Sequence, residues 1–199
     1  MKKITLLSVM IFAYAFAMAQ TATTDPGVVI NGVKWATRNV DKPGTFTAKA
    51  EDPGMFYQWN SNTGWTSSNP LTNSNGETEW VYYGEDAETW ETSNNVCPSG
   101  WRVPTNEELA SLANSGSEWT STPVNGRIFG SGKNTIFLPA AGMRNNSSSA
   151  LFKVDSSGYF WSNMANGKNA NLLYFDNANV TPGDSGRRAS GFSVRCVAK

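Results

Sequence analysis

The chain of 199 residues contains no histidine and only two cysteines, Cys97 and Cys196. A serine nucleophile needs an imidazole or similar base to take its proton, so hydrolysis of the serine-protease type is excluded. The string Gly183-Asp184-Ser185-Gly186 copies the nucleophile motif of trypsin-like proteases, and we predict that it is only a turn. The lack of histidine and the low number of cysteines also disfavour zinc binding, because histidine and thiolate are the usual zinc ligands.

Charge is also scarce. Charged residues make up 16% of the chain, with 16 basic and 16 acidic side chains. No run of basic residues is present, which argues against binding to nucleic acid. The Gly-Lys pair at 132–133 is no phosphate-binding loop, because Arg127 and Asn134 stand where that motif needs Gly and Ser or Thr.

Acid–base and metal chemistry find little support in the carboxylates. Pairs such as Glu107 and Glu108 are adjacent, and neighbouring side chains on a helix point apart. Calcium is left open as a ligand because Asp, Asn and Glu are plentiful. However, residues 176–186 lack the EF-hand spacing, since Ala178 stands where that motif needs a side chain with an oxygen ligand. We therefore expect no catalytic residues and no cofactor.

The one long apolar run lies at the N-terminus. Lys2 and Lys3 precede an apolar stretch at 4–16, and Ala17-Met18-Ala19 provides the small residues of a signal-peptidase site. We predict that residues 1–19 are a secretory signal peptide and that the product is secreted, periplasmic or at the cell surface. No other stretch approaches 18 apolar residues, so no membrane span is expected.

The rest of the chain is predicted to be a flexible tether at 20–27 followed by one domain at 28–199. Loss of two lysines with the signal peptide lowers the basic count from 16 to 14 against 16 acidic residues, a net charge of −2. In an exported protein two cysteines usually pair, so we predict a disulfide between Cys97 and Cys196. Two buried free thiols are the alternative.

Local patterns indicate short strands, many turns and little helix. Residues 31–32 are Asn-Gly between alternating apolar residues, which predicts a β-hairpin. A capping box at 105–108 predicts a helix over 106–114, and a second helix is considered near 85–93. The stretch 126–139 predicts two strands around a turn. The fold class expected from these elements is α+β.

Two segments, 61–93 and 163–190, lack the apolar alternation of strands and are rich in Asn, Gly and Ser. The first also contains several Trp and Tyr residues. Because loops on a rigid frame commonly carry recognition, we predict that these segments form a ligand surface. The candidate ligand-binding residues are Trp65, Trp80, Tyr83, Asn163, Asn166 and Asn169. The alternative for each is a place in the core or in a turn.

Six blocks in order resemble the signature of the Fibrobacter succinogenes major paralogous domain. They are VKWATRNV, GMFYQWN, CPSGWRVPTNEEL, FLPAAGMR, GYFWSN and GFSVRCV. The resemblance covers the chain from about residue 28 to its end. It implies an exported bacterial protein of a kind common in Bacteroidetes, and it makes the CPSGWRVPTNEEL block a structural joint between the disulfide and the helix.

The blocks RVPTNEEL and GFSVR are also similar to those of formylglycine-generating (sulfatase-modifying) enzymes, which have a variant C-type lectin-like fold. This resemblance implies an α+β, C-type lectin-like fold with short twisted sheets, one or two helices, long loops and both terminal strands in one sheet.

The expected function is non-catalytic binding or adhesion, with a glycan or a protein as the partner. A formylglycine-generating oxidase is the enzymatic alternative, but it needs a reactive cysteine pair, and Cys196 lies in the terminal strand instead. A structural subunit of a surface assembly is the third alternative.

Overall fold

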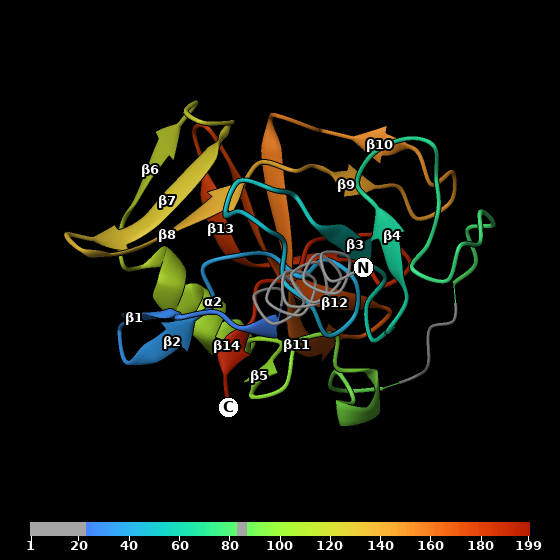
Figure 1. The fold of residues 1–199 in the computed structure, drawn as a ribbon, viewed down its shortest axis with the longest axis horizontal. Coiled ribbons are helices and arrows are strands. Elements are labelled where there is room, and N and C mark those ends of the chain that lie inside the picture. Colours follow the sequence, from blue (N-terminus) through green and yellow to red (C-terminus); the bar gives the residue numbers. More distant parts are fainter. Residues whose placement is uncertain (1–22, 83–86) are drawn as a thin grey trace, which may run out of the picture.

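The computed structural model describes residues 23–82 and 87–199 (Figure 1). Short strands dominate these ranges. In the first half they are β1 Val28–Ile30, β2 Val33–Trp35, β3 Met55–Tyr57, β4 Gly64–Thr66, β5 Trp101–Arg102, β6 Ser117–Thr120 and β7 Gly126–Ser131. In the second half they are β8 Asn134–Pro139, β9 Met143–Arg144, β10 Leu151–Phe152, β11 Ser157–Asn166, β12 Asn169–Asp176, β13 Val180–Arg187 and β14 Val197–Ala198.

The strands form five small antiparallel sheets. Three of them are β6-β7-β8, β11-β12-β13 and the four-stranded sheet β1-β2-β14-β5; the other two are the pairs β3-β4 and β9-β10. Val197 of β14 lies opposite both Trp35 of β2 and Arg102 of β5. The terminal strands β1 and β14 therefore share one sheet.

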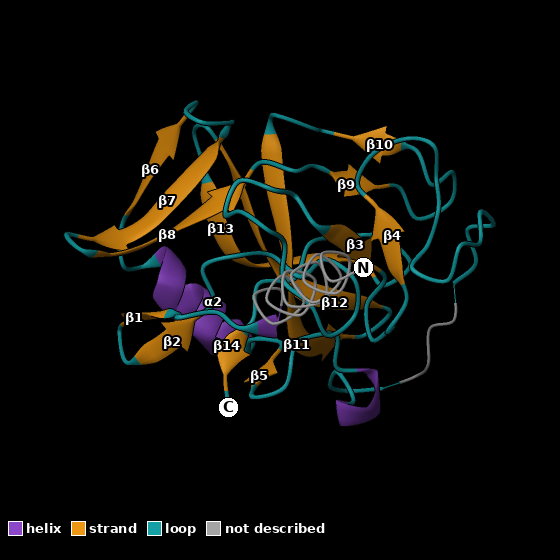
Figure 2. Ribbon diagram, in the orientation of Figure 1, coloured by secondary structure: helices purple, strands orange, loops and turns teal. Residues whose placement is uncertain are grey.

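The predicted α+β, C-type lectin-like class is wrong. Within the described ranges the helical elements are one α-helix, α2 Asn106–Ala113, and one turn of 3-10 helix, η1 Thr92–Asn94 (Figure 2). The second helix considered near 85–93 is absent from residues 87–91, which are irregular. The molecule is mostly β because consecutive short strands pair in antiparallel hairpins, while β14 adds long-range pairing to β2 and β5. None of the helices in the described ranges has the length and apolar character needed to cross a bilayer.

The strongest local predictions are confirmed. Asn31 and Gly32, with φ of 49° and 81°, connect β1 to β2 in the hairpin that Asn-Gly favours. Thr105 caps α2 through its side chain, which accepts a hydrogen bond from the Glu108 N–H, while the Glu108 carboxylate accepts one from the Thr105 N–H. The hairpin at 126–139 forms β7 and β8.

The segment 163–190 is not the loop that its composition predicted. Most of it lies in β11, β12 and β13, and the Gly-Asp-Ser-Gly string lies within β13. Along β12, Leu172 pairs with Asp184 and Leu173 with Pro182, so Gly183 is the extra residue of a β-bulge at φ 74°. A glycine tolerates that conformation, and the edge position of β13 explains its polar sequence.

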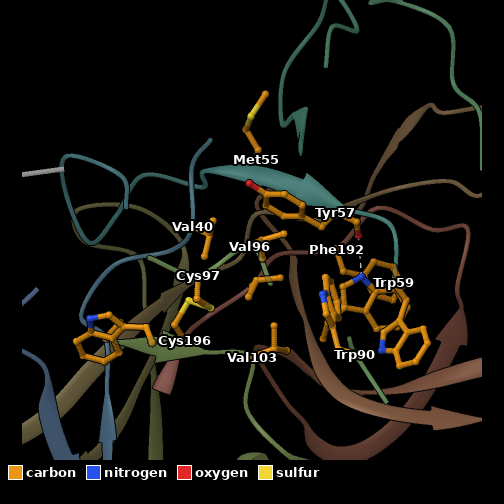
Figure 3. Close-up of a cluster of buried hydrophobic side chains, with 14 of the residues drawn as sticks. Val40, Met55, Tyr57, Trp59, Trp90, Val96, Cys97, Val103, Phe192 and Cys196 are labelled. Carbon is orange, nitrogen blue, oxygen red and sulfur yellow. Dashed lines mark hydrogen bonds between the residues drawn. A yellow bond between two sulfur atoms is a disulfide. The ribbon is translucent and has the colours of Figure 1, made fainter. Parts of the chain in front are cut away.

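Two apolar clusters hold the sheets together. The first surrounds the disulfide and includes Trp59, Trp90 and Phe192 (Figure 3). The second lies beneath α2, where Leu109 and Leu112 pack with residues of β7, β8, β11 and β12.

The predicted disulfide is present. Cys97 and Cys196 are bonded with Cα atoms 6.0 Å apart, and the bridge closes a separation of 99 positions (Figure 3). It joins the chain just before β5 to the chain just before β14, two strands that pair in the same sheet.

Candidate functional site

The two segments singled out from the sequence lie side by side in part. The Ala165 N–H donates to the Glu88 carbonyl at 3.0 Å, and the Trp90 N–H donates to the Asn163 carbonyl at 2.8 Å. Thr89 and Met164 form an antiparallel bridge between these bonds. Residues 88–90 therefore run along the end of β11, and the side chains of both segments can line common pockets.

One such pocket, which we call the Trp90 pocket, encloses about 290 Å3. Its walls combine an aromatic ring, hydroxyl and amide groups, and charges of both signs. The lining residues are Trp90, Glu91, Thr92, Asn95, Arg102, Val103, Asn163 and Lys199. Ligand pockets in proteins usually measure about 300–1,000 Å3, so this one suits a single sugar unit or a short stretch of peptide.

Hydrogen bonds fix the walls of the Trp90 pocket. The Trp90 indole N–H donates to the Asn94 carbonyl at 2.8 Å, and its ring meets the Trp59 ring edge-on at 6.0 Å. The Asn95 amide donates to the Trp101 carbonyl at 3.1 Å. In contrast, the Asn163 side-chain carbonyl is buried and has no hydrogen-bond partner among the described residues.

Arg102 is held at the edge of this pocket by a carboxylate. Its guanidinium donates two hydrogen bonds to Glu108, at 2.8 and 2.7 Å, and the hydrogen bond to Glu108 raises the pKa of Arg102. Partial burial alone would raise the pKa of Glu108, but the hydrogen bonds from Arg102 and from the Thr105 N–H lower it overall. The pair therefore stays ionised at neutral pH.

A second pocket, which we call the basic pocket, encloses about 520 Å3 at the β11–β12 turn and the end of β13. Three of its lining residues are cationic and four others carry hydroxyl or amide groups. The lining residues are Tyr82, Asn146, Lys168, Asn169, Ser185, Arg187, Arg188 and Ala189.

The walls of the basic pocket are supported from the core. The Trp80 indole N–H donates to the Asn146 carbonyl at 3.2 Å, and the Trp80 ring packs against Trp65 at 4.9 Å. On the other side, the buried Arg188 guanidinium lies 4.6 Å from the centre of the Trp59 ring. Both walls are therefore anchored to large buried rings.

The predicted site residues are distributed unevenly. Asn163 lines the Trp90 pocket and Asn169 lines the basic pocket. Trp65 is only 2% exposed and belongs to the core, and Trp80 supports a wall without lining either pocket. Asn166 is exposed and donates to the Asn171 side chain at 3.1 Å, outside both pockets. Tyr83 lies outside the described residues.

The sequence reasoning missed the cations of the basic pocket. Arg187 and Arg188 are adjacent in a chain with few charges, and Lys168 follows a turn glycine. These are visible signals, but the pairing of β12 with β13 is needed to bring the three side chains together. As for metals, no group of three or more acidic or thiol side chains in residues 23–82 and 87–199 is arranged to hold an ion.

Comparison with known proteins gives a single finding. No curated protein and no solved structure matches this chain, so the expected similarity to formylglycine-generating enzymes gains no support from a known fold. The profile of the Fibrobacter succinogenes major domain, however, matches residues 28–198, which is most of the chain. The chain therefore belongs to the Fibrobacter succinogenes major domain family.

Proposed function

We propose that this chain is an exported, non-catalytic binding domain that holds a glycan or a protein segment in the Trp90 pocket. The observation that carries the proposal is the composition of this pocket. An aromatic wall, the Thr92 hydroxyl, the amides of Asn95 and Asn163 and a nearby charge of each sign meet in one small space. Such mixed walls suit a ligand with both hydroxyl or amide groups and an apolar face.

The side-chain carbonyl of Asn163, which has no hydrogen-bond partner among the described residues, strengthens the proposal. A buried polar atom without a partner costs about 1–3 kcal/mol, and a donor brought by a ligand would recover part of that cost. The pocket also sits on a stiff frame, because Asn163 lies on β11 and its N–H donates to the Pro104 carbonyl at 2.8 Å. Little ordering entropy would then be lost on binding.

The cysteines support a non-catalytic role. Both are joined in one disulfide, and Cys196 is fully buried. A formylglycine-generating oxidase would need a reactive cysteine pair open to its substrate, and this chain has no further cysteine. Export is supported by the disulfide, which persists in oxidising compartments. The predicted signal peptide at 1–19 lies outside the described residues.

An array screen tests the proposal. The purified protein is applied to glycan and protein probes, and each binder is then measured with Asn163→Ala. We expect this variant to weaken binding by about fivefold or more, the usual cost of losing a central polar contact, with an unchanged melting temperature. Asn177→Ala is the matched control, since Asn177 is exposed and does not line the Trp90 pocket. Equal binding by both variants would refute the assignment of the pocket.

A further inference from the structure

The basic pocket is built by the register of the β11-β12-β13 sheet. Arg187 on β13 lies opposite Asn169 on β12, and Ser185 lies opposite Asn171. Because alternate residues of a strand share a face, Ser185 and Arg187 project from the same side of the sheet as Asn169. A hydroxyl, an amide and a guanidinium are thereby placed together on one polar face.

The fourth and fifth members come from the β11–β12 turn and from Arg188. Asn166 pairs with Asn169, so Gly167 and Lys168 form a two-residue turn, with φ of 59° at Gly167. The Arg188 guanidinium donates to the Gly167 carbonyl at 2.6 Å and to the Asn169 carbonyl at 3.1 Å. This buried arginine holds the turn, and with it Lys168, beside Arg187.

The described residues that line this pocket carry charge of one sign only. Of the described residues that line it, none is acidic, and the neighbouring Asp184 on β13 alternates to the other face of the strand. Neither Lys168 nor Arg187 forms an ion pair with any residue in the described ranges. The like charges of Lys168 and Arg187 repel one another when held together, and a bound anion would relieve that repulsion.

We propose that the basic pocket binds an acidic saccharide, a sugar unit that carries a carboxylate or a sulfate. Arg187 and Lys168 would hold the oxyanion, since guanidinium and ammonium groups form short charge-assisted hydrogen bonds to such groups. The side chains of Ser185, Asn146 and Asn169 offer donors and acceptors for sugar hydroxyls. The volume of about 520 Å3 accommodates more than the oxyanion alone.

The same features disfavour a nucleic acid. Nucleic-acid sites neutralise many phosphates along a stripe of basic residues, whereas here three cations are confined to one pocket of a chain with equal numbers of acidic and basic residues. The proposal concerns a site separate from the Trp90 pocket and does not depend on it.

Calorimetry with four defined probes tests the proposal. The probes are an oligogalacturonate, a sulfated heparin tetrasaccharide, a neutral galacto-oligosaccharide of matched length and a short oligoglutamate peptide. We expect binding of at least one acidic saccharide, no binding of the neutral one and weaker binding of the peptide. Affinity for the acidic saccharide should fall when salt is raised from about 20 to about 150 mM, because screening weakens exposed charge pairs.

Variants of equal charge locate the site. Lys168→Gln with Arg187→Gln should raise the Kd about tenfold or more. Lys42→Gln with Lys133→Gln removes the same charge from exposed positions elsewhere and should leave the Kd within about twofold. Asn163→Ala, in the Trp90 pocket, should also have no effect, which separates this proposal from the previous one. Loss of affinity in both double variants, equal binding of the neutral saccharide, tighter binding of the peptide or binding of no acidic saccharide would each overturn the proposal.

Discussion

Replacement of both Cys97 and Cys196 by alanine should lower the free energy of unfolding by about 4–5 kcal/mol. The bridge spans 99 positions, and the loop-closure entropy of the unfolded chain is worth about 4.7 kcal/mol for a loop near that length. Most domains are stable by only about 5–15 kcal/mol. The variant should therefore lose a large fraction of its stability.

Urea titration followed by tryptophan fluorescence measures this loss. Without the bridge, the unfolded chain expands and exposes more surface, so the slope of the free energy against urea should rise as the midpoint falls. Fully reduced wild-type protein is the control, and it should lose a similar amount. A loss below about 1 kcal/mol in both proteins would refute the entropic argument. A loss in the alanine variant alone would assign the effect to packing.

Three further substitutions test other parts of the fold. Asn39→Ala should cost about 2–4 kcal/mol in urea unfolding, because the fully buried Arg195 donates to the Asn39 side-chain carbonyl at 3.0 and 2.7 Å and would be left short of an acceptor. A loss under about 1 kcal/mol would contradict this. Gly183→Ala should cost about 1–2 kcal/mol from its φ of 74° alone, since a Cβ there meets nothing closer than 3.6 Å, and a neutral result would show that the bulge relaxes. Glu108→Gln should cost about 1 kcal/mol at pH 7. The pKa of Glu108 is lowered in the folded protein, so the difference in unfolding free energy between wild type and variant should be constant above pH 4.5, the ordinary pKa. This difference should shrink as the pH falls through the lowered pKa. A difference that persists at low pH would disprove the charge effect.

The sequence predicts those parts of the fold that depend on neighbouring residues. The Asn-Gly hairpin, the capping box of α2 and the hairpin at 126–139 each rest on contacts between residues close in the chain. The disulfide followed from the expected export and the cysteine count. The two hairpins and the capping box can be predicted from the residues that form them, and the disulfide from the presence of two cysteines.

The fold class could not be predicted in the same way. Several strands have only two or three residues, too few to display an alternating pattern, and β5 and β14 form through distant partners, as when β14 pairs with β2 and β5. The sequence of β13 favours a loop, because the bulge and the edge position of this strand allow Gly, Pro, Asp and Ser. Whether such a segment forms a strand depends on the strand it pairs with, and the local sequence does not show that partner.

The candidate site, too, can be predicted from the sequence only in part. Trp65 and Trp90 lie in one Asn-rich segment and both are buried, yet Trp90 also lines a pocket. Composition does not distinguish them, because both rings are large and mostly buried. The three cations of the basic pocket could be counted from the sequence, but only the register of β12 with β13 brings Lys168 and Arg187 together.

The central claim is that the protein binds its ligand in the Trp90 pocket and leaves it unchanged. An NMR titration of the isotope-labelled protein with the strongest binder from the array screen tests both parts at once. We predict that the backbone amide signals of Trp90, Thr92 and Asn163 shift with saturation, while the signals of the ligand show no new product. Shifts confined to residues outside that pocket, or steady conversion of the ligand, would contradict the claim.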